Sequence, residues 1–114
     1  MKVQFWAALA ACALVSAPAF AAEPIEGMWV RGNGTLIEFA PCSGGFCGTV
    51  RSGQYNGQPI GTMAGSGANY KGTVNVLDEG KTYNGKASVN GNTMKMSGCV
   101  MGGLICRGED LTRQ

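Results

Sequence analysis

Apolar and polar side chains alternate in several short runs of the chain after residue 27. The alternation is clearest at residues 81–90, where apolar side chains are separated by Thr, Asn, Lys and Ser, and this period is typical of a strand with one buried face. A second alternating run covers 93–97, and the Asn-Gly-Asn between the two runs predicts a hairpin turn. The same reasoning predicts further strands at 28–31, 35–40, 46–51, 72–77 and 105–113.

No stretch after residue 21 shows the apolar period of a helix. Asn-Gly, a dipeptide that accepts the positive φ angles of hairpin turns, occurs four times. About seven short strands joined by hairpins predict an all-β fold, an antiparallel meander closed or nearly closed into a small barrel that hides its edges. Residues 52–69 are rich in Gly, Ser, Asn and Gln, and we expect them to form the longest connection and a mobile rim.

Residues 1–21 have the pattern of a secretory signal peptide. A basic start precedes an apolar stretch, and small residues at 19–21 resemble a cleavage site. The stretch is too short to span a membrane, which takes roughly 20 apolar residues. We therefore expect residues 22–114 to form one domain that is periplasmic or secreted. The alternative is a lipoprotein anchored through Cys12, because Leu-Ala-Ala-Cys resembles a lipobox.

Four cysteines follow the predicted signal peptide, and an even number in an exported chain predicts disulfides: Cys42, Cys47, Cys99 and Cys106. A domain this small is expected to need such covalent staples. Chain entropy favours a long-range bridge, at about 4 kcal/mol against about 2 to 2.5 kcal/mol for a short loop. We nevertheless favour two local bridges, because glycines within each close pair permit a tight reversal. A structural zinc site on the four cysteines is the alternative.

Composition argues against several functional classes. The net charge is only +2 and the basic residues are scattered, so no nucleic-acid footprint is present. Histidine is absent, which removes the commonest general base and most catalytic metal sites. The adjacent carboxylates Asp78-Glu79 and Glu109-Asp110 are interpreted as a turn and a solvated strand, since neighbours on a strand point to opposite faces. We therefore expect no catalytic residue, cofactor or metal, and no enzyme.

Residues 66–70 form a candidate binding loop. Ser66, Gly67 and Tyr70 fit the Ser-Gly-x-x-Tyr pattern of periplasmic lysozyme inhibitors of the membrane-bound and periplasmic C-type class. That resemblance implies a loop that inserts into the lysozyme cleft, with its serine and tyrosine bound to the catalytic carboxylates. Inhibition of lysozyme is thus one hypothesis for the function.

Two methionines on one strand face offer another candidate. Met94 and Met96, with Tyr83 and Phe39 nearby, would line a pocket for a small apolar ligand, because methionine adapts to irregular shapes. Filling of the core by these side chains is the interpretation we favour, since barrels of this size are mostly filled by their own residues.

The two ends of the predicted domain share a further feature. Gly27-Met28-Trp29 opens the first strand and Leu111-Thr112-Arg113 closes the last, which resembles the lipocalin-like (calycin) barrels. The resemblance implies that Arg113 packs over the Trp29 indole and closes the barrel end, a cation–π contact worth about 0.5 to 2 kcal/mol.

A broader resemblance covers nearly all of residues 22–114, and its segments are 27–29, 42–48, 80–83, 94–99, 102–106 and 111–113. Together they are similar to the short form of the domain-of-unknown-function 2147 family, small exported bacterial proteins with no established activity. Where members of that family have tryptophan before the final Thr-Arg, this chain has Leu111. We therefore hypothesise a non-enzymatic binding or structural module of the cell envelope, whose partner is an envelope protein or a small apolar ligand.

Overall fold

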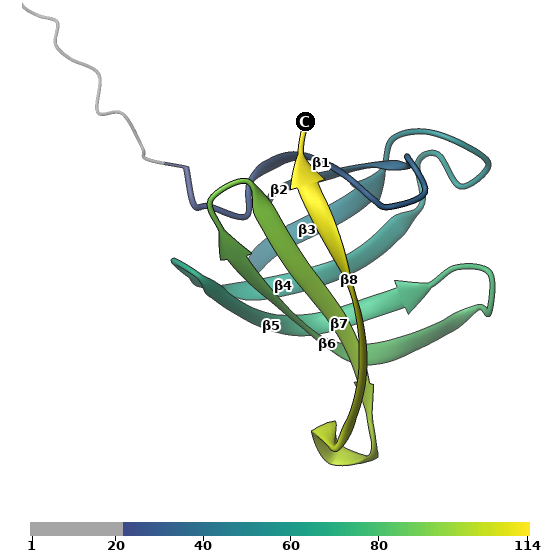
Figure 1. Ribbon diagram of the computed structural model, residues 1–114. Helices are drawn as coiled ribbons and strands as arrows, with labels where there is room; N and C mark the ends of the chain where they lie inside the picture. The colour runs from purple at the N-terminus through teal and green to yellow at the C-terminus, as the bar shows by residue number, and fades with distance from the viewer. Residues whose placement is uncertain (1–21) are drawn as a thin grey trace, which may run out of the picture.

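The structure, a computed structural model, describes residues 22–114 as one closed barrel of eight antiparallel strands (Figure 1). The strands follow one another around the barrel in chain order, and β1 pairs with β8 to close it. Their bounds are β1 Gly27–Val30, β2 Leu36–Cys42, β3 Gly45–Val50, β4 Pro59–Ser66, β5 Asn69–Val76, β6 Lys81–Asn90, β7 Thr93–Val100 and β8 Ile105–Arg113, with a short 3-10 turn, η2, at Met101–Gly103. The predicted antiparallel meander and its closure are confirmed.

The predicted signal peptide and the alternative anchor at Cys12 lie outside the described residues. Within residues 22–114, no helix has the length and apolar character needed to cross a membrane.

Strand β4 corrects the prediction that residues 52–69 form one long connection. Only 51–58 are a loop, and this loop is held by backbone hydrogen bonds such as that from Gly57 N to Val50 O, 2.7 Å long. A register shift between β3 and β4 breaks the alternation, so that Ile60 and Met63, three positions apart, are both buried. The barrel therefore has one strand more than the sequence pattern predicts.

Large side chains fill one end of the barrel, which we call the closed end. The turns at 43–44, 67–68 and 91–92 lie there, together with the segment that precedes β1. Ile25 of that segment is fully buried, and the Trp29 indole nitrogen donates a hydrogen bond to its carbonyl at 2.9 Å. The other fully buried large side chains are Tyr70, Phe39, Ile37, Met63, Met94, Leu111 and Val50.

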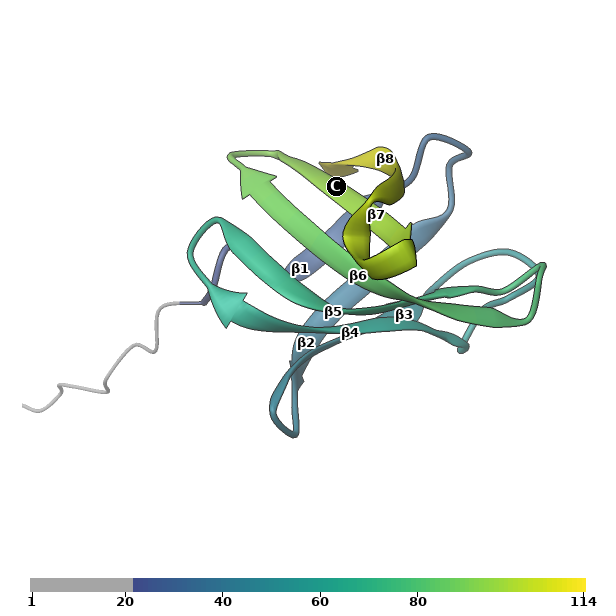
Figure 2. The same cartoon turned by 90° about the horizontal axis from the view of Figure 1, so that it is seen from below.

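Two disulfide bridges tie the strands of single hairpins together. Cys42 pairs with Cys47 in the β2–β3 hairpin, and Cys99 pairs with Cys106 in the β7–β8 hairpin. Both are the short-range bridges that the sequence favoured, and they leave none of these four thiols for the zinc alternative. The β7–β8 hairpin extends past its neighbours at the bottom of Figure 1, and its tip faces the viewer in Figure 2.

Candidate functional site

The end of the barrel opposite the closed end is open, and we call it the mouth. Four connections surround it, at 31–35, 51–58, 77–80 and 101–104. Between them lies a cavity of about 920 Å³. Its floor is apolar, and four strands each contribute one inward side chain to it: Val50, Ile60, Val74 and Met96. The cavity exists because large side chains fill only the closed half of the interior.

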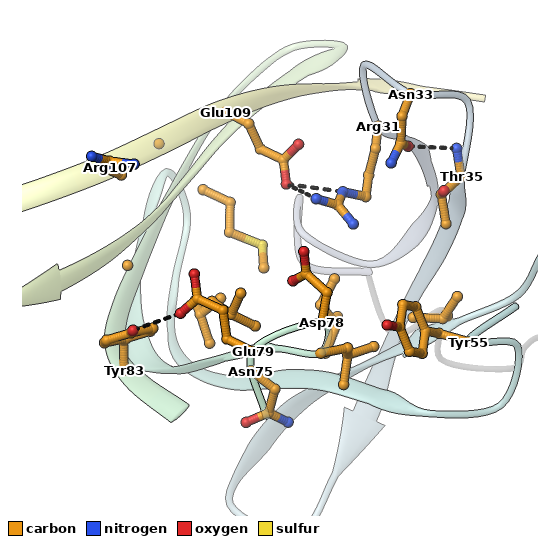
Figure 3. Close-up of a pocket in the computed structure, with 18 of the residues that line it drawn as sticks. Arg31, Asn33, Thr35, Tyr55, Asn75, Asp78, Glu79, Tyr83, Arg107 and Glu109 are labelled. Atoms are coloured by element: carbon orange, nitrogen blue, oxygen red, sulfur yellow. Dashed lines mark hydrogen bonds and ion pairs between the residues drawn. The ribbon is translucent and has the colours of Figure 1, made fainter. Parts of the chain in front are cut away.

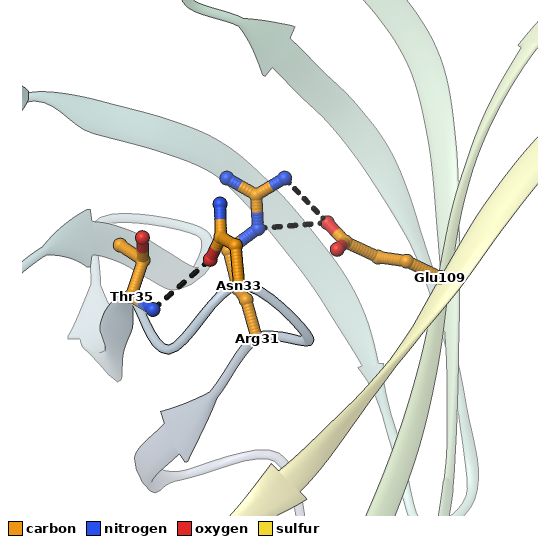
Figure 4. A network of polar contacts seen from close by, with 4 residues as sticks. All are labelled: Arg31, Asn33, Thr35 and Glu109. Atoms are coloured by element: carbon orange, nitrogen blue, oxygen red, sulfur yellow. Dashed lines mark hydrogen bonds and ion pairs between the residues drawn. The ribbon is translucent and has the colours of Figure 1, made fainter.

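An ion pair between Arg31 and Glu109 lies on one side of the mouth (Figure 4). Arg31 Nε and Nη2 each lie 2.9 Å from Glu109 Oε2, and the two side chains are 31% and 38% exposed. Strand alternation puts them there, because Arg31 follows the inward Trp29 by two positions and Glu109 precedes the inward Leu111 by two. A pair this exposed contributes less than about 1 kcal/mol to stability, so its main effect is to fix two charges at the rim.

The β1–β2 turn that carries Arg31 is held by its own hydrogen bonds. Asn33 Oδ1 accepts from Thr35 N at 3.0 Å (Figure 4), and Gly34 N donates to Arg31 O at 2.8 Å. An asparagine that binds the backbone two residues later is a common turn device. The turn thus places the Arg31 guanidinium at a defined point of the rim.

The β5–β6 turn supplies acidic groups across the mouth from this pair (Figure 3). Asp78 and Glu79 both line the cavity, and Tyr83 donates its hydroxyl to Glu79 Oε1 at 2.8 Å. This hydrogen bond to the Glu79 carboxylate raises the pKa of the Tyr83 phenol above its ordinary value. With Arg107 on β8, the rim carries two guanidinium groups and three carboxylates.

The candidate loop Ser66, Gly67 and Tyr70 is a tight turn rather than a projecting loop. Ser66 pairs with Asn69 across β4 and β5, so only Gly67 and Ala68 form the turn. The Tyr70 side chain is 2% exposed, packs edge-on against Phe46 and donates its hydroxyl to Gly67 O at 2.7 Å. Tyr70 would have to leave the core to reach another protein, and its burial weighs against the lysozyme-inhibitor hypothesis.

Trp29 and Arg113 meet at the closed end, remote from the mouth. The Arg113 guanidinium carbon lies 4.2 Å from the centre of the Trp29 ring. The guanidinium also donates to Glu26 O at 3.0 Å and to Pro24 O at 2.7 Å. Arg113 thereby fastens the segment before β1 across the barrel end, which is a structural role.

The two methionines divide between the halves of the interior. Met94 is fully buried in the closed half, as is Phe39, whereas Met96 is part of the cavity floor and Tyr83 part of its wall. The favoured interpretation of core filling therefore holds for Met94, while Met96 combines core packing with a surface open to a ligand.

Sequence reasoning missed the inward charges of the rim. Glu109 was interpreted as a member of a solvated carboxylate pair, but it shares a face with Leu111, and Arg31 shares a face with Trp29. The signal that would have found them is the period of two, continued past the last apolar residue of each strand. Charged residues at such positions lie above the core, where the barrel opens.

The mouth combines groups that can recognise a ligand. Within residues 22–114, no three His, Cys, Asp or Glu side chains gather in a way that could hold a metal ion. The site offers an apolar floor, hydrogen-bond donors and acceptors, and charges of both signs at the rim. Such a site is suited to hold a molecule with an apolar body and a polar end.

Comparison with known proteins places the chain in one family context. The model of the family described as "Uncharacterized protein conserved in bacteria (DUF2147)" matches residues 54–113. Neither a curated protein nor a solved structure matches the chain. The match covers β4 to β8, and so includes Asp78, Glu79, Arg107 and Glu109 of the rim.

Proposed function

The chain belongs to the DUF2147 family of uncharacterized bacterial proteins, and we propose that it is a non-enzymatic module that binds a small amphipathic ligand in the mouth of its barrel. The cavity of about 920 Å³ is the observation that carries this proposal. Small-molecule sites in proteins have volumes of roughly 300–1,000 Å³ and are mostly apolar with a few polar groups. A module that only had to be stable would gain by filling this space.

The lining indicates the chemical class of the ligand. Side chains of Val50, Val74 and Met96 would contact an apolar body, and the charged rim would contact a polar end. Because the Arg31–Glu109 pair satisfies its own charges, the polar end need not carry a net charge. The possible ligands are therefore molecules with a hydrocarbon or ring portion and a hydrogen-bonding head.

The proposed place of action is the periplasm or the outside of the cell. Two features support it, the signal-peptide pattern of residues 1–21 and the disulfides, which persist in oxidising compartments. The absence of histidine from the chain also supports a binding role over an enzymatic one.

A fluorescence titration with 11-(dansylamino)undecanoic acid, which has an apolar chain and a carboxylate head, tests the proposed binding. We expect saturable binding of one probe per chain with a dissociation constant in the micromolar range. Native mass spectrometry of protein from the producing cell would then reveal the natural ligand by its mass.

A pair of matched substitutions locates the bound probe. Gly98→Leu adds a side chain to a cavity-lining position, whereas Gly32→Leu adds the same side chain where nothing lies within 4 Å of a Cβ. We expect Gly98→Leu to weaken probe binding at least tenfold and Gly32→Leu to leave it unchanged. Equal affinity in all three proteins, or a wild-type protein that neither binds the probe nor carries a ligand, would refute the proposal.

A further inference from the structure

The tip of the β7–β8 hairpin is the most apolar exposed part of the described chain. Among residues 22–114, the exposed large apolar side chains are Val100, Met101, Leu104 and Ile105, and Leu104 is 84% exposed. No charged or polar side chain lies between the two cysteines of the hairpin, whose intervening residues are Val-Met-Gly-Gly-Leu-Ile. Contiguous apolar groups on an otherwise polar surface mark a contact site.

The backbone at the tip is strained at the residue that carries one of these exposed apolar side chains. Met101 has φ 56°, the one described residue other than glycine with a positive φ. Asn, Asp or Gly would adopt this conformation at lower cost. The Cys99–Cys106 bridge closes the hairpin directly beneath the tip. An apolar side chain held in an unfavourable conformation and 68% exposed contributes nothing to the barrel, which points to a role in contact with something outside it.

The size of the patch distinguishes between occupants. Four side chains of this kind expose on the order of 400 Å², close to the largest apolar patch of a typical monomer. A stable protein–protein interface buries about 800 Å² on each partner. A bilayer needs no complementary shape, and a few apolar side chains suffice to enter its interfacial region. The protruding tip therefore fits a lipid surface better than a second protein.

The tip is continuous with the cavity, which gives the contact a purpose. Val100 and Ile105 face each other across β7 and β8 and line the cavity as well as the tip. Arg107 lies exposed beside them, where its guanidinium can bind a lipid phosphate while the tip is immersed. An apolar path thus runs from the end of the tip to the cavity floor.

We propose that the Val100–Ile105 tip inserts into the surface of a lipid bilayer and holds the mouth of the barrel against it. Passage of an acyl-chain ligand between bilayer and cavity follows as a consequence, and that consequence rests on the proposed function. The insertion itself depends only on the exposed tip.

Flotation with phosphatidylcholine vesicles tests the insertion, using residues 22–114, which contain every strand and the whole core described above. The variant Met101→Asn with Leu104→Gln makes the tip polar and relieves the strain at 101, since Asn tolerates positive φ. We expect vesicle partitioning to fall on the order of a hundredfold, about tenfold for each apolar side chain. The control Met101→Leu with Leu104→Met keeps the tip apolar and should float like wild type.

Two outcomes overturn the proposal. One is equal flotation of the wild type and the polar variant. The other is failure of the wild type to float while light scattering shows a dimer that the polar variant abolishes, since the tip would then be a self-association surface. Probe binding is measured without vesicles, so the two proposals fail separately. A wild-type protein that binds the probe but does not float refutes only the insertion. A wild-type protein that floats but does not bind the probe refutes only the proposed function.

Discussion

Gly98 offers the sharpest test of whether the interior is hollow, because a side chain there should stabilise the barrel and impair binding together. A Cβ on Gly98 would lie 3.6 Å from Tyr83 Cβ and 4.0 Å from Tyr83 Cδ2, which are ordinary contacts. Glycine within a strand costs about 0.5–1 kcal/mol relative to alanine. Val is among the best strand formers, on a scale that spans about 1 kcal/mol. We therefore expect Gly98→Val to raise the free energy of unfolding by about 1 kcal/mol.

Urea unfolding followed by the fluorescence of the buried Trp29 measures this change. With a slope of about 1 kcal/mol/M for a small domain, the midpoint should rise by about 1 M. Probe affinity should fall tenfold or more, since overfilling a packed site costs about 1–3 kcal/mol. The contrast is Gly85→Ala, whose Cβ would collide with Val74 Cγ2 and should destabilise the protein. A loss of stability in Gly98→Val would show that the space is filled and would refute the reasoning.

Three further predictions concern the closed end and the tip. Tyr70→Phe should lower the free energy of unfolding by about 1 kcal/mol through a lost hydrogen bond. Because burial raises the pKa of the Tyr70 phenol, the phenol ionises at lower pH in the unfolded chain than in the folded one, so the free energy of unfolding of the wild type falls as pH rises above about 10. Urea titrations at rising pH should show a smaller fall in the free energy of unfolding for Tyr70→Phe than for the wild type. An equal fall in both proteins would contradict this. Arg113→Met should cost about 2–3 kcal/mol, from the contact with Trp29 and two hydrogen bonds, and an unchanged urea midpoint would contradict it. Replacing Cys99 and Cys106 by serine should cost about 2–2.5 kcal/mol and reduce vesicle flotation by loosening the tip; thermal unfolding at the wild-type temperature would contradict the first part.

The strands could be predicted best where apolar and polar side chains alternate and turn residues follow. Residues 81–90 were predicted with the bounds of β6, because alternation there is regular and an Asn-Gly turn follows. Residues 105–113 were predicted with the bounds of β8, although Arg107 and Glu109 occupy inward positions there. Strand β4 could not be predicted, since its register shift breaks the period of two. A bulge is a property of the pairing between two strands, and one strand's sequence does not reveal it.

The site was less predictable than the fold for a related reason. The cavity results from the side chains that are missing at positions such as Gly98, and a sequence pattern reports the side chains that are present. Tyr70 illustrates the reverse error, because its motif suggested an exposed loop while its place on the inward face of β5 buries it. The direction in which a strand residue faces, which the period of two gives, was a better guide to its burial than the motif.

The glycines of the barrel explain why such a small domain can hold a cavity. Glycines lie within strands at positions 48, 61, 72 and 85, where an added Cβ would collide with a neighbouring strand or side chain. These residues permit the tight coiling that closes the sheet. Gly98 pairs with Gly85 across β6 and β7 but has free space beside it. Coiling alone therefore does not require glycine at 98, whereas an open mouth does. The substitution Gly98→Val therefore separates the demand for stability from the demand for an open mouth in one molecule.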